Sequence, residues 1–338
     1  MTLEGTNGYV VRAGPGTLVA IDPGIDEPGH IEAFVEHARA ARAQYAAIFV
    51  THGHPDHFPG ALALRSATGA PIFAHGSASF GHDRALDDGT RVPFENATFV
   101  ALHAPGHARD HLVFWLEEQG ALFTGDVVVG TGTVVIAPPA GDMRVYVASL
   151  ERLLRDYGHA DVIYGGHGPS VRAPRAKLRE YLDHRAMREA QVVAALAHGP
   201  ATIPELVANI YAGVSERLWP AAARQVLAYL IALSRENRVC ASALDREPTP
   251  REAALLNPDL GALAHPGDRL APQVPVRLFR GNEAGITPLA GRTGRTATPT
   301  PQRSWHRLRH PSETLTFAYA GSAPRRRRGR ARGWHRWW

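Results

Sequence analysis

The chain has 338 residues, of which 44% are hydrophobic and 20% charged, as is ordinary for a globular protein that can hold two compact domains. No apolar run approaches the roughly 20 residues of a membrane-spanning helix, so we expect no membrane partner. A single cysteine, Cys240, excludes an internal disulfide framework. The amino-terminal residues lack the basic and apolar regions of a signal peptide, and we therefore predict a cytoplasmic location.

The net charge of +5 combines two unlike parts of the chain. Residues 1–245 carry 20 Lys and Arg against 26 Asp and Glu, a net charge of −6, whereas residues 246–338 carry 17 against 6, a net charge of +11. The basic part holds 11 prolines without sustained periodicity, which predicts a disordered tail. Its Arg- and Trp-rich end could bind RNA or an acidic surface, or could be a solvated or out-of-frame extension.

Short apolar runs alternate with helical patterns in the first half of the chain. The pattern predicts a hairpin at its start and then strands and helices in turn, which is typical of sheets flanked by helices. The expected strands are residues 8–12, 17–21, 46–50, 71–74, 99–102, 112–116, 121–124 and 162–164, and the expected helices are residues 30–45, 59–68 and 146–157.

From about residue 172 the pattern becomes helical. Helices are expected at residues 178–197, 202–210 and 221–236, followed by an extended piece at 239–243, an order that favours a winged-helix-like domain. Thr202 and Glu205 form a capping-box pattern at the second of these helices. We predict three domains: a catalytic domain at residues 1–172, a helical winged-helix-like domain at 173–245, and the Arg- and Pro-rich tail at 246–338.

Histidine and aspartate side chains gather where the predicted strands end. Residues 51–57 read Thr-His-Gly-His-Pro-Asp-His and come directly after a buried strand, where rigid neighbours could hold ligands still. Imidazole nitrogen and carboxylate oxygen are ligands for zinc-like divalent ions. The alternative is a polar turn that is rich in histidine by chance. The candidate ligands are His52, His54, Asp56, His57, His107, Asp126 and His167.

These motifs resemble those of the metallo-β-lactamase superfamily. The motifs are His-Gly-His-Pro-Asp-His at residues 52–57, Pro-Gly-His ending at His107, Thr-Gly-Asp ending at Asp126 and Gly-Gly-His-Gly-Pro around His167. The finer resemblance, over roughly residues 1–245, is to the beta-lactamase-like protein 2 group, which includes endoribonucleases and related thioester hydrolases. It is carried by residues 4–7 (Glu-Gly-Thr-Asn), 106–111, 141–143, 146, 149–150 and 184–189.

The resemblance implies a four-layer αββα sandwich of the α+β class that holds two Zn²⁺ or other divalent ions. His52, His54 and His107 would bind the first ion, Asp56, His57 and His167 the second, and Asp126 would bridge them. Two such ions about 3.5–4 Å apart can share a hydroxide and polarise the substrate oxygen. Asp56 and Asp126 are the expected catalytic carboxylates, since Asp56 could also orient the nucleophile and take its proton.

Further residues are candidates for supporting roles. Asp22 resembles the family's carboxylate that orients a ligand imidazole, although Asp-Pro-Gly is equally a turn sequence. His111 could lie behind the ligands or contact the substrate. We expect His75, His82 and His103 at the surface or in satisfied core positions, and we do not assign His184 as a ligand. The family also has a strand before residues 2–7, so this chain either lacks an edge strand or starts upstream.

The expected function is a dinuclear metal-dependent hydrolase. Its first candidate substrate is single-stranded RNA, and the alternative is an acyl thioester of the hydroxyacylglutathione or acyl-carrier type. The net charge of residues 1–245 argues against a large polyanion unless the charge is uneven. The winged-helix-like domain could bind nucleic acid, serve packing or support a homodimer.

Three other functions are weaker candidates. A β-lactamase is disfavoured because Asp126 replaces the cysteine of one major lactamase class and no signal peptide is present. A mononuclear iron dioxygenase would use His52, His54, His107 and Asp126 alone. A non-enzymatic nucleic-acid binder would make the metal structural, but structural zinc is closed by four ligands, whereas seven candidates for two ions leave open positions.

Overall fold

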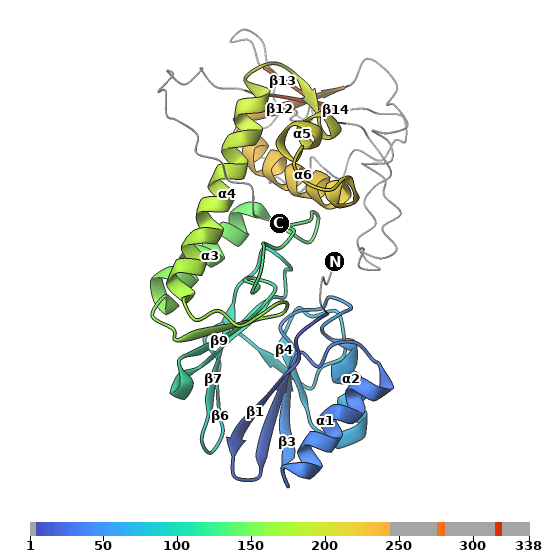
Figure 1. Ribbon diagram of the computed structural model, residues 1–338, viewed down its shortest axis with the longest axis vertical. Helices are drawn as coiled ribbons and strands as arrows, with labels where there is room; N and C mark the ends of the chain where they lie inside the picture. Colours follow the sequence, from blue (N-terminus) through green and yellow to red (C-terminus); the bar gives the residue numbers. More distant parts are fainter. Residues whose placement is uncertain (1–4, 244–275, 281–314, 320–338) are drawn as a thin grey trace, which may run out of the picture. The chain divides into compact units, whose positions relative to one another are not determined.

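The computed structural model describes residues 5–243, 276–280 and 315–319, and the chain divides into two compact units (Figure 1). Of the described residues, the first unit holds 5–134 and 144–184, and the second holds 135–143, 185–243, 276–280 and 315–319. Among the described residues, none of the helices is both long and apolar enough to cross a membrane. Most of the tail predicted at residues 246–338 lies outside the described residues.

The first sheet of the first unit follows chain order. β1 and β2 form the predicted antiparallel hairpin, and every later strand runs parallel to its neighbour, so the carboxyl ends of β2 to β5 share one edge. The strands are β1 (Tyr9–Gly14), β2 (Thr17–Ile21), β3 (Gln44–Phe49), β4 (Ile72–His75) and β5 (Arg84–Leu86).

Two helices, α1 (Pro28–Ala40) and α2 (Pro59–Thr68), cover the outer face of this sheet, where Ile31 and Leu64 join Ile48 in an apolar cluster (Figure 1). Each helix begins with proline in its first turn, where the missing N–H costs nothing. The predicted helix over residues 30–45 is too long, because Arg42 has a φ of 48° and the chain has entered β3 by Gln44.

The second sheet has the strand order β10-β9-β8-β7-β6. Its pairs are antiparallel except β9–β10, which is parallel, so the carboxyl ends of β7, β9 and β10 lie at one edge. The elements are β6 (Arg91–Pro93), β7 (Thr98–His103), β8 (Leu112–Leu116), a short 3₁₀ helix at Glu117–Gln119, β9 (Ala121–Gly125) and β10 (Val162–Gly165).

Helix α3 (Met143–Tyr157) packs on the outer face of the second sheet, where the Tyr157 ring lies 5.4 Å from that of Trp115 on β8. Between the sheets, Phe49 of β3 stacks on Phe114 of β8 with ring centroids 4.7 Å apart. Both rings belong to one apolar cluster that extends across the two sheets. The layers are therefore helix, sheet, sheet, helix, as predicted.

The second unit contains two helices and a small sheet. Thr202 caps α5 (Ile203–Ile210), and the reciprocal bonds with Glu205 confirm the predicted capping box. The strand order is β11-β13-β12-β14. Helix α4 (Pro174–Leu196) contributes residues to both units. The remaining elements of the second unit are β11 (Ala201–Thr202), a 3₁₀ helix at Glu216–Leu218, α6 (Trp219–Arg235), β12 (Val239–Ala243), β13 (Val276–Arg280) and β14 (Leu315–Tyr319).

Candidate metal centre

The seven predicted ligands come from four strand-end loops of the first unit. His52, His54, Asp56 and His57 follow β3 of the first sheet. The other three ligands follow strands of the second sheet: His107 lies beyond β7, Asp126 directly after β9, and His167 after β10. Since both sheets end at the same edge of the sandwich, the loops converge there.

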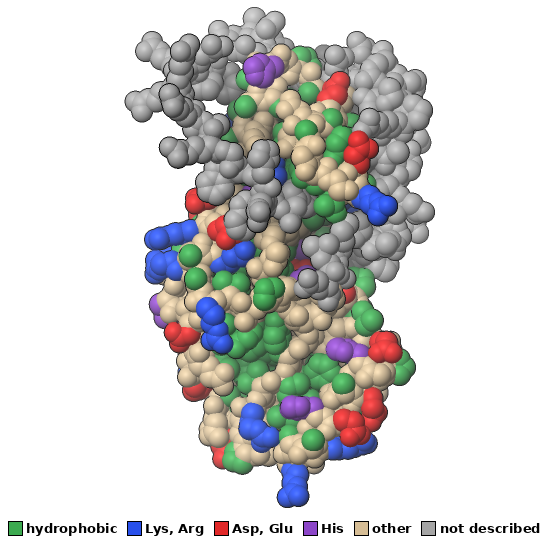
Figure 2. Space-filling view, viewed as in Figure 1, with side chains coloured by type: hydrophobic (Ala, Val, Ile, Leu, Met, Phe, Trp, Pro, Cys, Tyr) green, Lys and Arg blue, Asp and Glu red, His purple; other side chains and the backbone are tan. Residues whose placement is uncertain are grey.

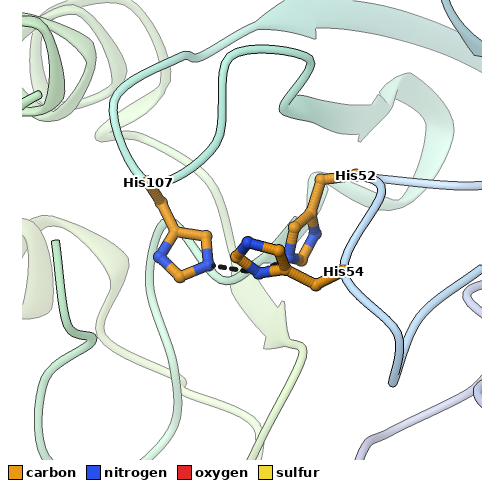
Figure 3. A group of neighbouring side chains, drawn as sticks. All are labelled: His52, His54 and His107. Atoms are coloured by element: carbon orange, nitrogen blue, oxygen red, sulfur yellow. Dashed lines mark hydrogen bonds between the residues drawn. The ribbon is translucent and has the colours of Figure 1, made fainter. Parts of the chain in front are cut away.

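Three histidines form the first group, His52, His54 and His107 (Figure 3). His54 Nδ1 lies 2.9 Å from His52 Nε2 and 3.0 Å from His107 Nε2. A neutral imidazole nitrogen carries either one proton or one lone pair, so His54 Nδ1 can form a good hydrogen bond with only one of its two neighbours. A cation placed where the three nitrogens converge would bind the lone pairs of all three. Around one tetrahedral zinc ion, such nitrogens lie roughly 3.3 Å apart.

Asp126 lies between this group and the remaining ligands. Its Oδ2 is 3.7 Å from His107 Nε2 and 3.3 Å from His167 Nε2, and its Oδ1 is 3.6 Å from His57 Nε2. A carboxylate that faces histidines of both groups has the position that a bridging ligand requires. The arrangement agrees with the role that the family resemblance implies for Asp126.

Asp56, His57 and His167 form the second group. Asp56 Oδ2 lies 3.5 Å from His57 Nε2 and 3.4 Å from His167 Nε2. The Asp56 side chain is 30% exposed, whereas that of His57 is fully buried. The His167 side chain is 18% exposed, so Asp56 is the most accessible member of this group.

The residues fit a bound cation because buried polar atoms face one another without partners. His57 Nε2 and Asp126 Oδ1 are both buried, and neither has a hydrogen-bond partner among the described residues. Leaving such groups unsatisfied costs about 1–3 kcal/mol each, which coordination would offset. The donor set of imidazoles and carboxylates suits a divalent metal such as zinc.

Asp22 holds two residues of the His loop. Its Oδ1 accepts the Thr51 N–H at 2.7 Å, and its Oδ2 accepts the Thr51 hydroxyl at 2.6 Å. The same Oδ2 lies 2.9 Å from His57 Nδ1. Because a carboxylate only accepts, the proton of neutral His57 sits on Nδ1 and its Nε2 is free to bind a metal. Asp22 also has a positive φ of 46°, in the left-handed region.

Thr51 and Asp110 are supporting residues that our sequence reasoning missed. The Thr51 hydroxyl lies 3.0 Å from His52 Nδ1, and the Asp110 carboxylate accepts the Gly53 N–H at 2.9 Å. The signal for Thr51 was its place directly before the His loop, where threonine is also an ordinary strand-end residue. Asp110 lies in the segment 106–111 that carries the family resemblance, but it is distant in sequence from the loop that it contacts, so its role could not be assigned from the sequence.

His111 lies behind the first group rather than in contact with solvent. It is fully buried, its ring stacks on His52 at 4.5 Å, and its Nε2 accepts the Asp126 N–H at 3.1 Å. Burial excludes direct contact with a substrate and favours the supporting role. Gly125 leaves room for this packing, because a Cβ there would lie 2.6 Å from Thr51 Oγ1 and 2.9 Å from the His111 ring.

The protonation of the site follows from burial and charge. Burial, reinforced by neighbouring imidazoles, lowers the pKa of His52 and of His111 well below the usual value, so both are neutral. Burial would also lower the pKa of His57, but the charges of Asp126 and Asp22 outweigh it and raise that pKa to about 9. Nearby His57 and His167 hold the pKa of Asp126 low despite its burial, so this carboxylate stays ionised.

The other histidines lie outside these groups. His75 stacks on His103 with ring centroids 4.1 Å apart, and each makes a further hydrogen bond, to Ser77 and to the Arg109 carbonyl respectively. His82 Nδ1 contacts the Phe80 carbonyl. As expected, these three are surface or satisfied positions, and His184 is not a member of the groups.

The fold and the site together define a member of the metallo-β-lactamase superfamily. The Metallo-beta-lactamase superfamily model matches residues 1–167, and the Beta-lactamase associated winged helix domain model matches residues 202–244. The chain belongs to this superfamily, and both the predicted family and the predicted fold are confirmed.

Particular relatives carry several names. The Lactamase-like protein adaB of Aspergillus niger is 31% identical over 76% of this chain and 83% of its own length. The Atrochrysone carboxyl ACP thioesterase of Aspergillus terreus is 34% identical over 62% of this chain and 68% of its own length. The Beta-lactamase-like protein 2 homolog of Drosophila melanogaster is 30% identical over 71% of this chain and 85% of its own length.

A solved structure shares the fold. The metallo-beta-lactamase family protein of Thermus thermophilus is 22% identical, has a TM-score of 0.58, and covers 70% of this chain and 91% of its own.

Proposed function

We propose that this protein is a hydrolase that binds two Zn²⁺ ions and cleaves acyl thioesters, with an acyl-carrier thioester as the substrate class. His52, His54 and His107 would hold one ion, and Asp56, His57 and His167 the other, with Asp126 shared. When bound, the ions would supply Lewis acidity and a water molecule acidic enough to react near neutral pH. The convergence of these seven side chains is the observation that carries the proposal.

The two carboxylates of the site, Asp126 and Asp56, would have different roles in the reaction. Asp126 is buried and stays ionised, so it is suited to holding charge rather than exchanging protons. Asp56 is partly exposed and sits beside His57 and His167, so its carboxylate is suited to orient the attacking water and accept its proton. No serine or cysteine nucleophile is needed.

The relatives support the thioester as substrate. The Aspergillus terreus relative is named an acyl-carrier thioesterase and matches 62% of this chain at 34% identity. Single-stranded RNA, the first candidate from sequence, is now the second, supported by the match to a winged helix domain and by the beta-lactamase-like protein 2 resemblance.

The charge distribution bears on this choice. Residues 1–245 carry a net charge of −6, and on the face in Figure 2 basic and acidic side chains both occur over the first unit. A long polyanion binds through many neutralising contacts, so this balance disfavours RNA. A thioester presents one reacting carbonyl to the metal centre and needs no such extended basic surface.

One experiment tests the class of reaction and the substrate together. Full-length protein loaded with Zn²⁺ would be assayed side by side against acyl-carrier thioesters and single-stranded RNA, with metal content measured on the same samples. We expect about two metals per chain and thioester turnover that is lost in His54→Ala and kept in His37→Ala, which alters an exposed residue of α1. RNA cleavage without thioesterase activity would reverse the two substrates, and unchanged turnover in His54→Ala would exclude the metal mechanism.

The assembly and the location remain predictions. The winged-helix-like domain would support a homodimer, which sedimentation of the full-length protein would test. The expected cytoplasmic location is tested by fractionation of the native cell.

A further inference from the structure

The short segment Gly5–Asn7, just before β1, contacts two ligands of the second metal group. The Gly5 carbonyl accepts a hydrogen bond from His167 Nδ1 at 2.9 Å. The Thr6 hydroxyl donates to Asp56 Oδ2 at 2.8 Å. Both ligands are thus touched by residues that precede them in the chain by 50 positions or more.

Asn7 fixes the loop that carries His167. Its N–H donates to the Gly166 carbonyl at 2.7 Å, and its side-chain amide donates to the carbonyls of Gly165 and Gly168 at 3.0 and 2.8 Å. These contacts bracket His167 on both sides. One asparagine therefore satisfies three backbone carbonyls of a four-residue loop that otherwise has little regular structure.

The segment is anchored at its other end by Tyr9. The Tyr9 hydroxyl donates to the same Gly165 carbonyl at 2.6 Å, and its ring packs 5.3 Å from Phe123 of the second sheet. Tyr9 itself pairs with Ile21 in the first sheet. The segment is therefore held by both sheets, which makes it a stiff support for the residues it touches.

The contacts also settle the tautomer of His167. A carbonyl oxygen only accepts, so the bond to Gly5 places the neutral ring's proton on Nδ1. The lone pair of Nε2 then points towards Asp56 and Asp126, which lie 3.4 and 3.3 Å away. Partners behind a metal-binding histidine fix its orientation in this way and commonly set metal affinity.

We propose that the segment Gly5–Asn7 is a positioning device for the second metal ion alone. The described contacts of the segment reach Asp56 and the His167 loop, whereas the first group is supported elsewhere, by Thr51 and by Asp110 on Gly53. The two groups share the contacts of Asp22 with Thr51 and His57, whereas the described contacts of residues 5–7 reach ligands of the second ion. The affinity of the second ion therefore depends on residues 5–7 in a way that the affinity of the first does not. This inference rests on the proposed two-metal function.

The test is a zinc titration of metal-free full-length protein, with Thr6→Val, Asn7→Ala and wild type compared. We expect the first equivalent to bind as in wild type and the second to bind about 10-fold to 100-fold more weakly. Thr90→Val is the matched control, because it removes the hydrogen bond that the Thr90 hydroxyl accepts from the Asp87 N–H, in the turn between β5 and β6. Asp110→Ala is the converse variant, expected to weaken the first equivalent.

The outcomes separate this inference from the function beneath it. If wild type binds two ions and Thr6→Val binds both with the same affinities as wild type, the inference is overturned and the two-metal function is left intact. Equal weakening of both equivalents in Thr6→Val also overturns it, since the segment would then support the whole fold. Wild type that takes up no second ion overturns the two-metal function and the inference with it. If Asn7→Ala fails to fold, Thr6→Val, which removes a single hydrogen bond at a partly exposed position, decides the matter.

Discussion

Thr51 gives both of its donors to Asp22, its N–H at 2.7 Å and its hydroxyl at 2.6 Å. Since the hydroxyl has only one proton, it can meet His52 Nδ1, 3.0 Å away, only as an acceptor. The proton of neutral His52 therefore sits on Nδ1, and Nε2 is left to bind a metal. Through Thr51 and directly, a single carboxylate sets the tautomers of His52 and His57, which the proposed function assigns to different ions.

Replacing Thr51 by valine tests this relay. Thr51→Val keeps the shape of the buried side chain but leaves the His52 Nδ1–H without an acceptor and removes one bond to Asp22. We expect a loss of about 1–3 kcal/mol in the free energy of unfolding and a weakening of zinc binding by about 10–100-fold. Urea unfolding of metal-free protein and a zinc titration measure the two effects. Zinc affinity equal to that of wild type would refute the relay.

Gly166 tests how tightly the two metal groups are packed. A Cβ at Gly166 would lie 2.4 Å from Asp126 Oδ1 and 2.8 Å from the His57 ring. We expect Gly166→Ala to abolish uptake of the second metal equivalent and to destabilise the protein by about 1–3 kcal/mol through overpacking. Gly81→Ala is the matched control, since a Cβ at Gly81 meets nothing within 4 Å. Normal metal content in Gly166→Ala, measured by elemental analysis, would contradict the observed packing.

The raised pKa of His57 predicts how the stability of the metal-free protein depends on pH. Burial opposes the charged ring, but Asp126 and Asp22 raise its pKa from 6.5 to about 9. A raised pKa contributes stability that is fully present below about pH 6.5 and is lost as the pH rises through about 9. The urea midpoint of metal-free protein should therefore fall between these pH values. His167, whose pKa is also raised, adds to the fall.

The lowered pKa of His52 makes the free energy of unfolding rise with pH, which is opposite to the effect of His57. This rise ends at about pH 6.5, so it does not affect the range between pH 6.5 and 9. In Asp22→Asn, which removes one of the three carboxylate charges that raise the pKa of His57, the fall in the urea midpoint should be shallower. A midpoint that rises from pH 6.5 to pH 9 in the metal-free wild type would show that His57 is not held charged.

The cap of α5 offers a test confined to the second unit. Thr202 is fully buried, and its hydroxyl accepts the Glu205 N–H. Thr202→Ala should lower the free energy of unfolding by about 1 kcal/mol, within a usual range of about 0.5–2 kcal/mol. Zinc affinity should not change, which makes this variant a control for the Thr51 experiment. A change in zinc affinity on capping loss would link the two units energetically.

Much of the first unit was predictable because its signals are local. The strand at 112–116 and the helix at 59–68 were predicted with the bounds that the structure shows. The strand is a continuous apolar run between charged or polar residues, and the helix lies between Pro59 and Gly69. β5, β6 and β11 were not predicted as strands. They have two or three residues each, too few for alternation to register, and they form only because a neighbouring strand supplies hydrogen bonds.

The candidate metal-binding residues could be named from the sequence for a similar reason, whereas the supporting roles of Asp22 and His111 were left open between alternatives. Histidine clusters after apolar runs mark strand-end loops, and parallel strands bring those loops to one edge. The roles of Asp22 and His111 depend instead on side-chain direction: Asp22 in Asp-Pro-Gly satisfied a turn interpretation and a supporting one equally. Only the fold shows that its carboxylate reaches Thr51 and His57, 29 and 35 positions away.

The ligands divide between the two sheets: four follow β3, and three follow strands of the opposite sheet. An ion bound by residues of both sheets would link the two sheets of the sandwich at the edge where these loops lie, and chelation would remove that link. Binding of the ions would then stabilise the contact between the sheets, of which the Phe49–Phe114 stack is part, and chelation would weaken that contact.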